Sequence, residues 1–144
     1  MTQIFFYHNA ADRIAASVAL ISRAFAQHKT LVVYAPEPEL AAAIDRHLWM
    51  HPPGGFVPHV RADSPLAAQT PILIAQTLDA ADALAHSERL FNLANDVPSG
   101  FSRFTSVIEV VGQDAEERLA SRQRVKFYKD RGYEIKYIDL AENS

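Results

Sequence analysis

Cysteine is absent from this sequence of 144 residues, and glycine is scarce. Without a thiol the chain has no disulfide, no cysteine nucleophile and no cysteine-ligated metal site. No run of eighteen apolar residues occurs, and the N-terminus opens directly on a strand-like segment, so we expect neither a membrane span nor a signal peptide. We therefore expect a cytoplasmic protein without a membrane partner, folded as one domain over residues 1–144.

The five glycines form no phosphate-binding motif. After the first apolar run the chain continues with His8-Asn9-Ala10-Ala11-Asp12, where a dinucleotide-binding fold has glycines that let the backbone approach pyrophosphate. No Walker-type loop and no Gly-x-Ser-x-Gly elbow occurs either, so we expect no cofactor. His8 and Asp12 could still form an acid–base pair, and the chain would then be a small nucleotide- or phosphate-using α/β enzyme. This is the alternative to a protein without a catalytic site. The start of a helix explains the same two residues.

Short apolar runs alternate with segments of helical periodicity along the chain. The runs that predict strands are Ile4–Tyr7, Leu31–Tyr34, Ile72–Ala75, Arg89–Leu93, Val107–Val111 and Tyr133–Ile138. The predicted helices are one capped by Asn9 that ends near His28, one that begins at Pro38, and Asp114–Arg131 with Gly132 as its C-cap. Residues 62–70 are expected to form a surface loop, and residues 79–88 a short helix or an irregular connection.

This alternation predicts an α/β fold. Strands that alternate with helices form a mostly parallel sheet with helices on both faces, joined by right-handed crossovers. Continuous apolar runs such as Leu31–Tyr34 are typical of strands that are covered on both faces. The sequence thus indicates a three-layer α/β/α single domain, Rossmann-like without a nucleotide site.

The sole tryptophan precedes a loop rich in proline and glycine. Pro52 and Pro53 end the helix that leads into this loop, because they lack amide donors and restrict the residues before them. The stiff loop is expected to present Trp49, Phe56 and Val57. Large aromatic side chains in such a place either plug the core or form a docking surface for a partner. The pattern alone leaves both interpretations open.

Three histidines near this loop raise the question of a metal site. His47 and His51 are four residues apart, a spacing that would place both rings on one face of a continuous helix, and His59 follows. Against this, Pro52 interrupts the helix and no carboxylate lies between His47 and His51. Capping or hydrogen bonding within the loop explains the three residues, and we expect no metal.

The last helical segment carries most of the positive charge. From Arg118 to Arg131 there are six bases and one acid, so subtracting this local +5 from the net charge of −3 leaves −8 for the rest. An acidic body disfavours general binding to DNA phosphates. The expected core side of this helix holds Ala120 and Phe127. The opposite, cationic side holds Arg118, Arg122, Val125, Lys126 and Lys129.

A solvated face explains such a helix, but a second interpretation is open. A cationic strip interrupted by the apolar Val125 suits an acidic peptide with a hydrophobic end. Direct binding of single-stranded DNA is a third possibility, and the lack of interleaved aromatic side chains on this face argues against it.

The sequence resembles a known family over nearly its full length. Ile44–Trp49, followed by Phe56-Val57-Pro58-His59, is similar to the signature of the chi subunit of bacterial DNA polymerase III. The N-terminal Phe-Tyr strand and the segment Phe104–Val111 extend the resemblance. The last helix shares the spacing of Arg122, Arg124, Lys126, Tyr128 and Gly132. At position 125 this chain has Val, whereas the family's best-known pattern has an aromatic residue.

The resemblance implies a non-catalytic accessory subunit that links the clamp loader to single-stranded-DNA-binding protein during replication and meets DNA only indirectly. Its partner would be that protein's acidic C-terminal tail, which ends in phenylalanine. Arg122 would clamp the terminal carboxylate, and Lys126 and Arg118 would meet the acidic side chains. Val111 would help to form the pocket for the aromatic ring, on the surface that Val125 and Lys129 complete.

A second partner is implied at the loop. Trp49 and Phe56 match residues at which the family docks a peptide-like segment of the psi subunit, and Val57 lies beside them. Psi is patchily distributed among bacteria, so another clamp-loader component is the alternative partner at this place.

Overall fold

Seven parallel strands form one sheet in this computed structural model, which describes residues 1–50, 57–78 and 86–141. The strands are β1 (Gln3–Ala10), β2 (Leu31–Tyr34), β3 (His59–Arg61), β4 (Ile72–Ala75), β5 (Arg89–Asn92), β6 (Ser106–Gly112) and β7 (Ile135–Asp139). Their order across the sheet is β3-β4-β2-β5-β6-β1-β7. The α-helices of the described residues are α1 (Arg13–Ala26), α2 (Pro38–Met50) and α3 (Ala115–Asp130). One-turn 3-10 helices occur at Ala67–Gln69 and Phe101–Arg103.

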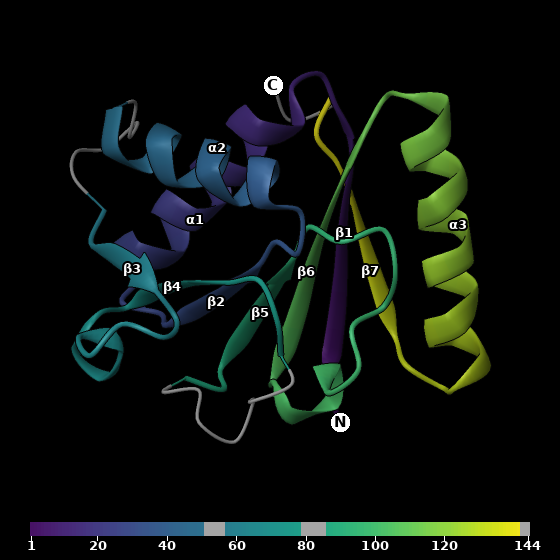
Figure 1. Cartoon of the computed structure of the whole chain (residues 1–144). Coiled ribbons are helices and arrows are strands. Elements are labelled where there is room, and N and C mark those ends of the chain that lie inside the picture. The colour runs from purple at the N-terminus through teal and green to yellow at the C-terminus, as the bar shows by residue number, and fades with distance from the viewer. Residues whose placement is uncertain (51–56, 79–85, 142–144) are drawn as a thin grey trace.

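The helices cover both faces of the sheet, as the alternating pattern predicts (Figure 1). On one face α1 and α2 pack through Ile21 and Ile44 onto strand residues such as Val33. On the other face Tyr128 of α3 packs onto Phe6 and Leu90. The central strands β2, β4, β5 and β6 therefore bury both of their faces, and this explains the continuous apolar runs in the sequence.

Most predicted boundaries are confirmed within one or two residues. Leu31–Tyr34 and Ile72–Ala75 are strands with the predicted limits, and α2 begins at Pro38. Gly132 follows α3 with a φ of 81°, the left-handed conformation that suits a glycine just after a helix. β3 was not predicted, because three residues are too short for a clear alternation. Residues 62–70 form a loop with one 3-10 turn, and residues 79–85 of the predicted connection lie outside the described residues.

The predicted cap of α1 is wrong by three residues. Asn9 still belongs to β1, where it has a φ of 65°. Asp12 is the residue that caps the helix, because its Oδ1 accepts a hydrogen bond of 3.1 Å from the amide of Ala15. The helix-start interpretation of Asp12 is thus confirmed.

The buried side of α3 also differs from the prediction. Its buried residues are Arg124 and Tyr128, whereas Ala120 and Phe127 are only partly covered. The hydropathy pattern could not indicate this, since an arginine counts as an exposed residue unless a buried acid compensates it. The compensating acid is Glu109, at the centre of β6, with a side chain that is 0% exposed.

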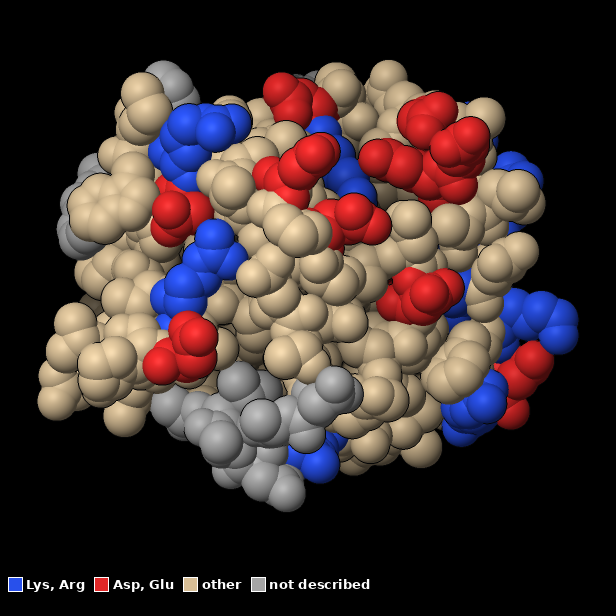
Figure 2. Space-filling view, in the orientation of Figure 1, with Lys and Arg blue, Asp and Glu red and all other residues tan. Residues whose placement is uncertain are grey.

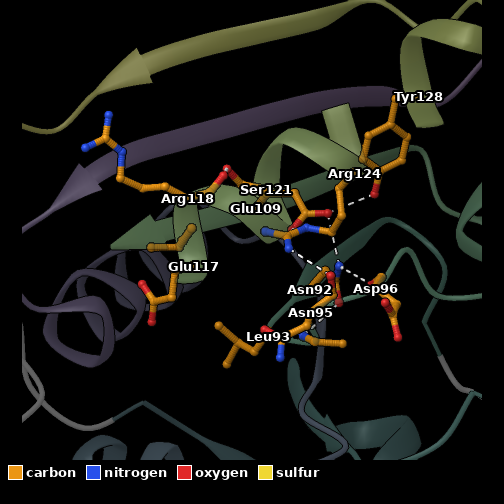
Figure 3. A network of polar contacts seen from close by, with 12 residues as sticks. Asn92, Leu93, Asn95, Asp96, Glu109, Glu117, Arg118, Ser121, Arg124 and Tyr128 are labelled. Carbon is orange, nitrogen blue, oxygen red and sulfur yellow. Dashed lines mark hydrogen bonds and ion pairs between the residues drawn. The ribbon is translucent and has the colours of Figure 1, made fainter. Parts of the chain in front are cut away.

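Glu109 is the centre of a buried polar network between the sheet and α3 (Figure 3). Its Oε1 accepts from Nε of Arg124 at 3.1 Å. Its Oε2 accepts from the hydroxyl of Tyr128 at 2.9 Å and from Nδ2 of Asn92 at 3.0 Å. Arg124 also donates to the carbonyl of Asn95 at 2.9 Å. The network thereby joins α3 to β6 and to the loop after β5.

The network consists of a carboxylate with its donors. Burial raises the pKa of Glu109, while the guanidinium of Arg124 and the three donated hydrogen bonds oppose this shift. Burial and the charge of Glu109 raise the pKa of Tyr128, which keeps its hydroxyl a donor. Removing one partner of a buried pair leaves an uncompensated charge, so an arrangement of α3 that separates Arg124 from Glu109 would be unfavourable.

We expect Arg124→Met to lower the free energy of unfolding by about 3–5 kcal/mol, because the carboxylate of Glu109 would stay buried without a cation. Urea denaturation measures the loss. Arg122→Met, at an exposed position of the same helix, should change stability by no more than about 0.5 kcal/mol. The double variant Glu109→Leu Arg124→Met should recover part of the loss. Equal losses at positions 122 and 124 would contradict this role of the ion pair.

Candidate functional site

A groove of about 860 Å³ lies between α3 and the sheet strands β1, β6 and β7. We call it the α3–β7 groove. Its helix wall consists of Arg118, Ser121, Arg122, Val125, Lys126, Lys129 and Asp130. Its sheet wall consists of Phe6, His8, Asn9, Val111, Gly112, Tyr137 and Asp139. The spacing of the helix residues places them along one side of α3, so the groove follows the helix for most of its length.

The rim of the groove is cationic. Arg118, Arg122, Lys126 and Lys129 are all exposed, as the sequence predicts. No acidic side chain within the described ranges forms an ion pair with Arg118 or Arg122. In Figure 2 several basic side chains lie along the α3 edge of the molecule, others lie on the α2 side, and many of the acidic side chains lie near the carboxyl ends of the strands. The cationic side of α3 expected from the sequence is therefore present at the surface.

The floor of the groove is apolar. Phe6 and Val111 are buried, and Val125 is half-buried and packs against the core on the α3 face. Tyr137 is 51% exposed, and its ring centroid lies 6.4 Å from that of Phe6. A floor of this kind binds an apolar or aromatic group, and the rim binds anions.

The two acids of the groove already have partners. Asp130 forms an exposed ion pair of 3.1 Å with Lys126. Asp139 accepts from Nδ2 of Asn9 at 3.3 Å and from the amide of Ala141 at 2.9 Å. Four bases against two acids leave the groove with a net charge of +2.

A carboxylate of the chain fills the place where an α/β fold of this kind would bind a phosphate. β1 and β6 are neighbours, but α1 and α3 follow them on opposite faces, which makes their carboxyl ends a switch point. There Oε2 of Glu117 accepts from the amide of Gly112 at 2.8 Å, and its Oε1 lies 3.9 Å from Arg13. A Cβ on Gly112 would collide with Oε2 of Glu117. Glu117 therefore occupies the anion position at the start of α3.

His8 and Asp12 lie in different parts of the structure. His8 lines the α3–β7 groove, and Asp12 caps α1 on the other face. The acid–base pair of the alternative interpretation therefore gains no support from their placement.

The loop region presents Trp49 but not Val57. Trp49 is 56% exposed at the end of α2, so the core-plug interpretation is wrong for this residue. Val57 is 2% exposed and packs in the core with Ile44 and Leu48, so the prediction that the loop presents Val57 is wrong. The burial follows from its position just before β3, which draws the chain back to the sheet. Phe56 lies outside the described residues.

Two of the three histidines form hydrogen bonds with the backbone. Nδ1 of His47 lies 2.8 Å from the carbonyl oxygen of Ala43, and Nδ1 of His59 lies 2.7 Å from that of Val57. Nε2 of His59 lies 3.0 Å from Oδ1 of Asp45, and the ring of Trp49 stacks edge-on at 5.1 Å from the His59 ring. His51 lies outside the described residues, and the described part of the chain contains no cluster of three metal-ligating side chains.

Sequence reasoning missed three residues that shape the groove. The sequence does contain an indication that Glu109 is a buried charge, because it is the sole charged residue within the apolar run Val107–Val111. The sequence gives no such indication that Phe6 and Tyr137 line the groove, because a strand pattern does not tell which helix covers each face of the sheet. All six residues predicted for the tail surface do line the groove: Val111, Arg118, Arg122, Val125, Lys126 and Lys129.

Comparison with known proteins points to one family. The family model described as DNA polymerase III chi subunit, HolC, matches residues 1–136. DNA polymerase III subunit chi of Pseudomonas aeruginosa is 24% identical over 139 residues, which cover 94% of each chain. The protein of the same name from Haemophilus influenzae is 30% identical over 95 residues, which cover 66% of this chain and 65% of the relative. None of the described helices is long and apolar enough to cross a membrane. The chain belongs to the family of DNA polymerase III chi subunits, and it is therefore an accessory subunit of the replication machinery.

Proposed function

We propose that the chain, acting as one chi-like domain in the cytoplasm, links the clamp loader to single-stranded-DNA-binding protein without a catalytic role of its own. The α3–β7 groove would hold that protein's acidic C-terminal tail. One observation carries the proposal: the four bases and two valines predicted for this role all line the same groove.

The dimensions and chemistry of the groove suit such a tail. From Arg118 to Asp130 the helix rises by about 18 Å, which an extended peptide covers with about five residues. Arg122 has no ion-pair partner among the described residues and presents a planar fork of donors that matches a terminal carboxylate. Arg118 and Lys126 would meet acidic side chains, while Val111 and Val125 offer apolar contact to a terminal aromatic ring.

The exposed end of α2 is the proposed place for a second partner. Trp49 and the neighbouring Met50 both expose more than half of their surface. An exposed tryptophan beside an apolar residue is a typical anchor of a protein interface. We therefore propose that psi, or another clamp-loader component, docks at Trp49, with Phe56 as a further contact.

The alternative function, a small nucleotide- or phosphate-using enzyme, has less support. The phosphate position at the switch point holds Glu117, and Asp12 serves as a helix cap. Both observations argue against a phosphate site at this edge of the sheet.

Arg122→Ala should weaken binding of an acidic peptide ending in phenylalanine by about 10- to 150-fold, the range for hydrogen bonds to a charged group. Lys129→Ala should cost less than about fivefold, since Lys129 is an exposed base at the rim. Isothermal titration calorimetry measures both. Amidation of the peptide's C-terminus serves as control, because Arg122→Ala should cost little further affinity for the amidated peptide. Equal losses for the two variants would refute the role of Arg122.

The affinity for this peptide should fall steeply as salt rises from low to physiological concentration, because exposed charges are screened within about 8–10 Å. Titrations at several salt concentrations test this. An affinity that does not change with salt would indicate an apolar pocket in which the four bases take no part.

Trp49→Ala should reduce affinity for the clamp-loader partner by about 30-fold or more, as expected for an interface anchor. Co-purification of the variant with psi and the clamp loader measures the loss. The same variant should keep full affinity for the tail peptide. Leu119→Ala, which also truncates an exposed apolar side chain, is the matched control and should behave like wild type. Unchanged assembly of Trp49→Ala would place the second interface elsewhere.

A further inference from the structure

Tyr137 is a large aromatic residue that the fold leaves half uncovered inside the α3–β7 groove. It belongs to β7, the last strand at one edge of the sheet. In the register of the sheet it lies opposite Phe6, so both side chains point to the face that α3 covers. Ile135, two residues earlier on the same face, packs against the core under α3. The helix therefore covers the start of β7 but leaves Tyr137 open to the groove.

The environment of Tyr137 is suited to a second aromatic ring. Phe6 lies behind it with a centroid distance of 6.4 Å and an interplanar angle of 36°. Nζ of Lys129 lies 5.9 Å from the centroid of the Tyr137 ring. A ring that already contacts an aromatic neighbour and a cation loses less conformational freedom when a ligand ring packs on it than a ring without such contacts.

The other apolar side chains of the groove offer less contact. Val111 is buried and Val125 is half-buried, so each adds only a small apolar surface to the floor. In this chain the sheet wall, not the helix wall, provides the exposed aromatic surface.

We infer that Tyr137 is a specificity-determining residue of the groove, and that it selects a ligand whose C-terminal side chain is aromatic. This inference rests on the proposed tail-binding function. The peptide lies between the two walls: its terminal ring packs on Tyr137 and Phe6 of the sheet, and its carboxylates meet the bases of α3. The bases thus recognise charge, and Tyr137 recognises the identity of the last residue.

The test measures a ratio of affinities. Two acidic peptides of identical length, one ending in phenylalanine and one in alanine, are titrated calorimetrically into wild-type protein and into Tyr137→Leu. Leucine retains apolar area but removes the ring. We expect the wild type to prefer the phenylalanine peptide, and the substitution to lower this preference by about 3- to 10-fold, the value of an aromatic pair beyond its buried area. Affinity for the alanine peptide should change little.

Two control variants keep the result interpretable. Tyr137→Phe retains the ring and should retain the preference. Leu119→Ala truncates an exposed apolar residue of α3 that does not line the groove. This variant should also retain the preference for the phenylalanine peptide. Thermal melting of Tyr137→Leu, a substitution at a half-exposed position, checks that the variant is folded.

The outcomes separate this inference from the function on which it rests. An unchanged preference in Tyr137→Leu, or an equal loss for both peptides, would overturn the role of Tyr137 and leave the tail-binding function standing. Failure of the wild type to bind either peptide would overturn both. A loss of preference in Tyr137→Leu alone would support the assignment.

Discussion

The ion pair of Glu109 and Arg124 determines how α3 faces the sheet, and the rest of the site depends on that orientation. Arg124 and Arg122 lie about 200° apart around a helix, so burying the first turns the second away from the core. With Arg124 and Tyr128 bound to Glu109, the side of the helix that carries Arg118, Arg122 and Lys129 borders the groove. A purely apolar contact would permit small rotations of the helix, whereas two directional hydrogen bonds from α3 to one carboxylate restrict them.

The parts of the fold that follow from local patterns could be predicted from the sequence. Leu31–Tyr34 and Ile72–Ala75 form strands because both faces are apolar, and the exposed bases of α3 follow from its charge. The errors lie where a residue's role depends on a distant partner. Arg124 is buried because of Glu109, 15 residues away, and Val57 is buried because β3 joins the sheet. The exposure of Tyr137 depends on where α3 stops covering β7, which no local pattern contains.

The structure also shows what occupies the phosphate position of this Rossmann-like sheet. In dinucleotide-binding folds the amide groups at the start of a helix hold a phosphate. Here the amide of Gly112 and the guanidinium of Arg13 face the carboxylate of Glu117 instead. The α3–β7 groove follows the side of the helix rather than its end, so the architecture is retained while the open cationic surface lies along α3.

The order of the strands separates the two proposed contacts. Trp49 stacks on His59 of β3, and the groove lies over β6, β1 and β7, so four to six inter-strand steps of about 4.8 Å each, roughly 19–29 Å in all, lie between them. Two peptide segments docked at such a distance would not overlap with one another. The strands between the two places form one continuous hydrogen-bonded sheet, so both proposed contacts, if made, would be held at a fixed spacing.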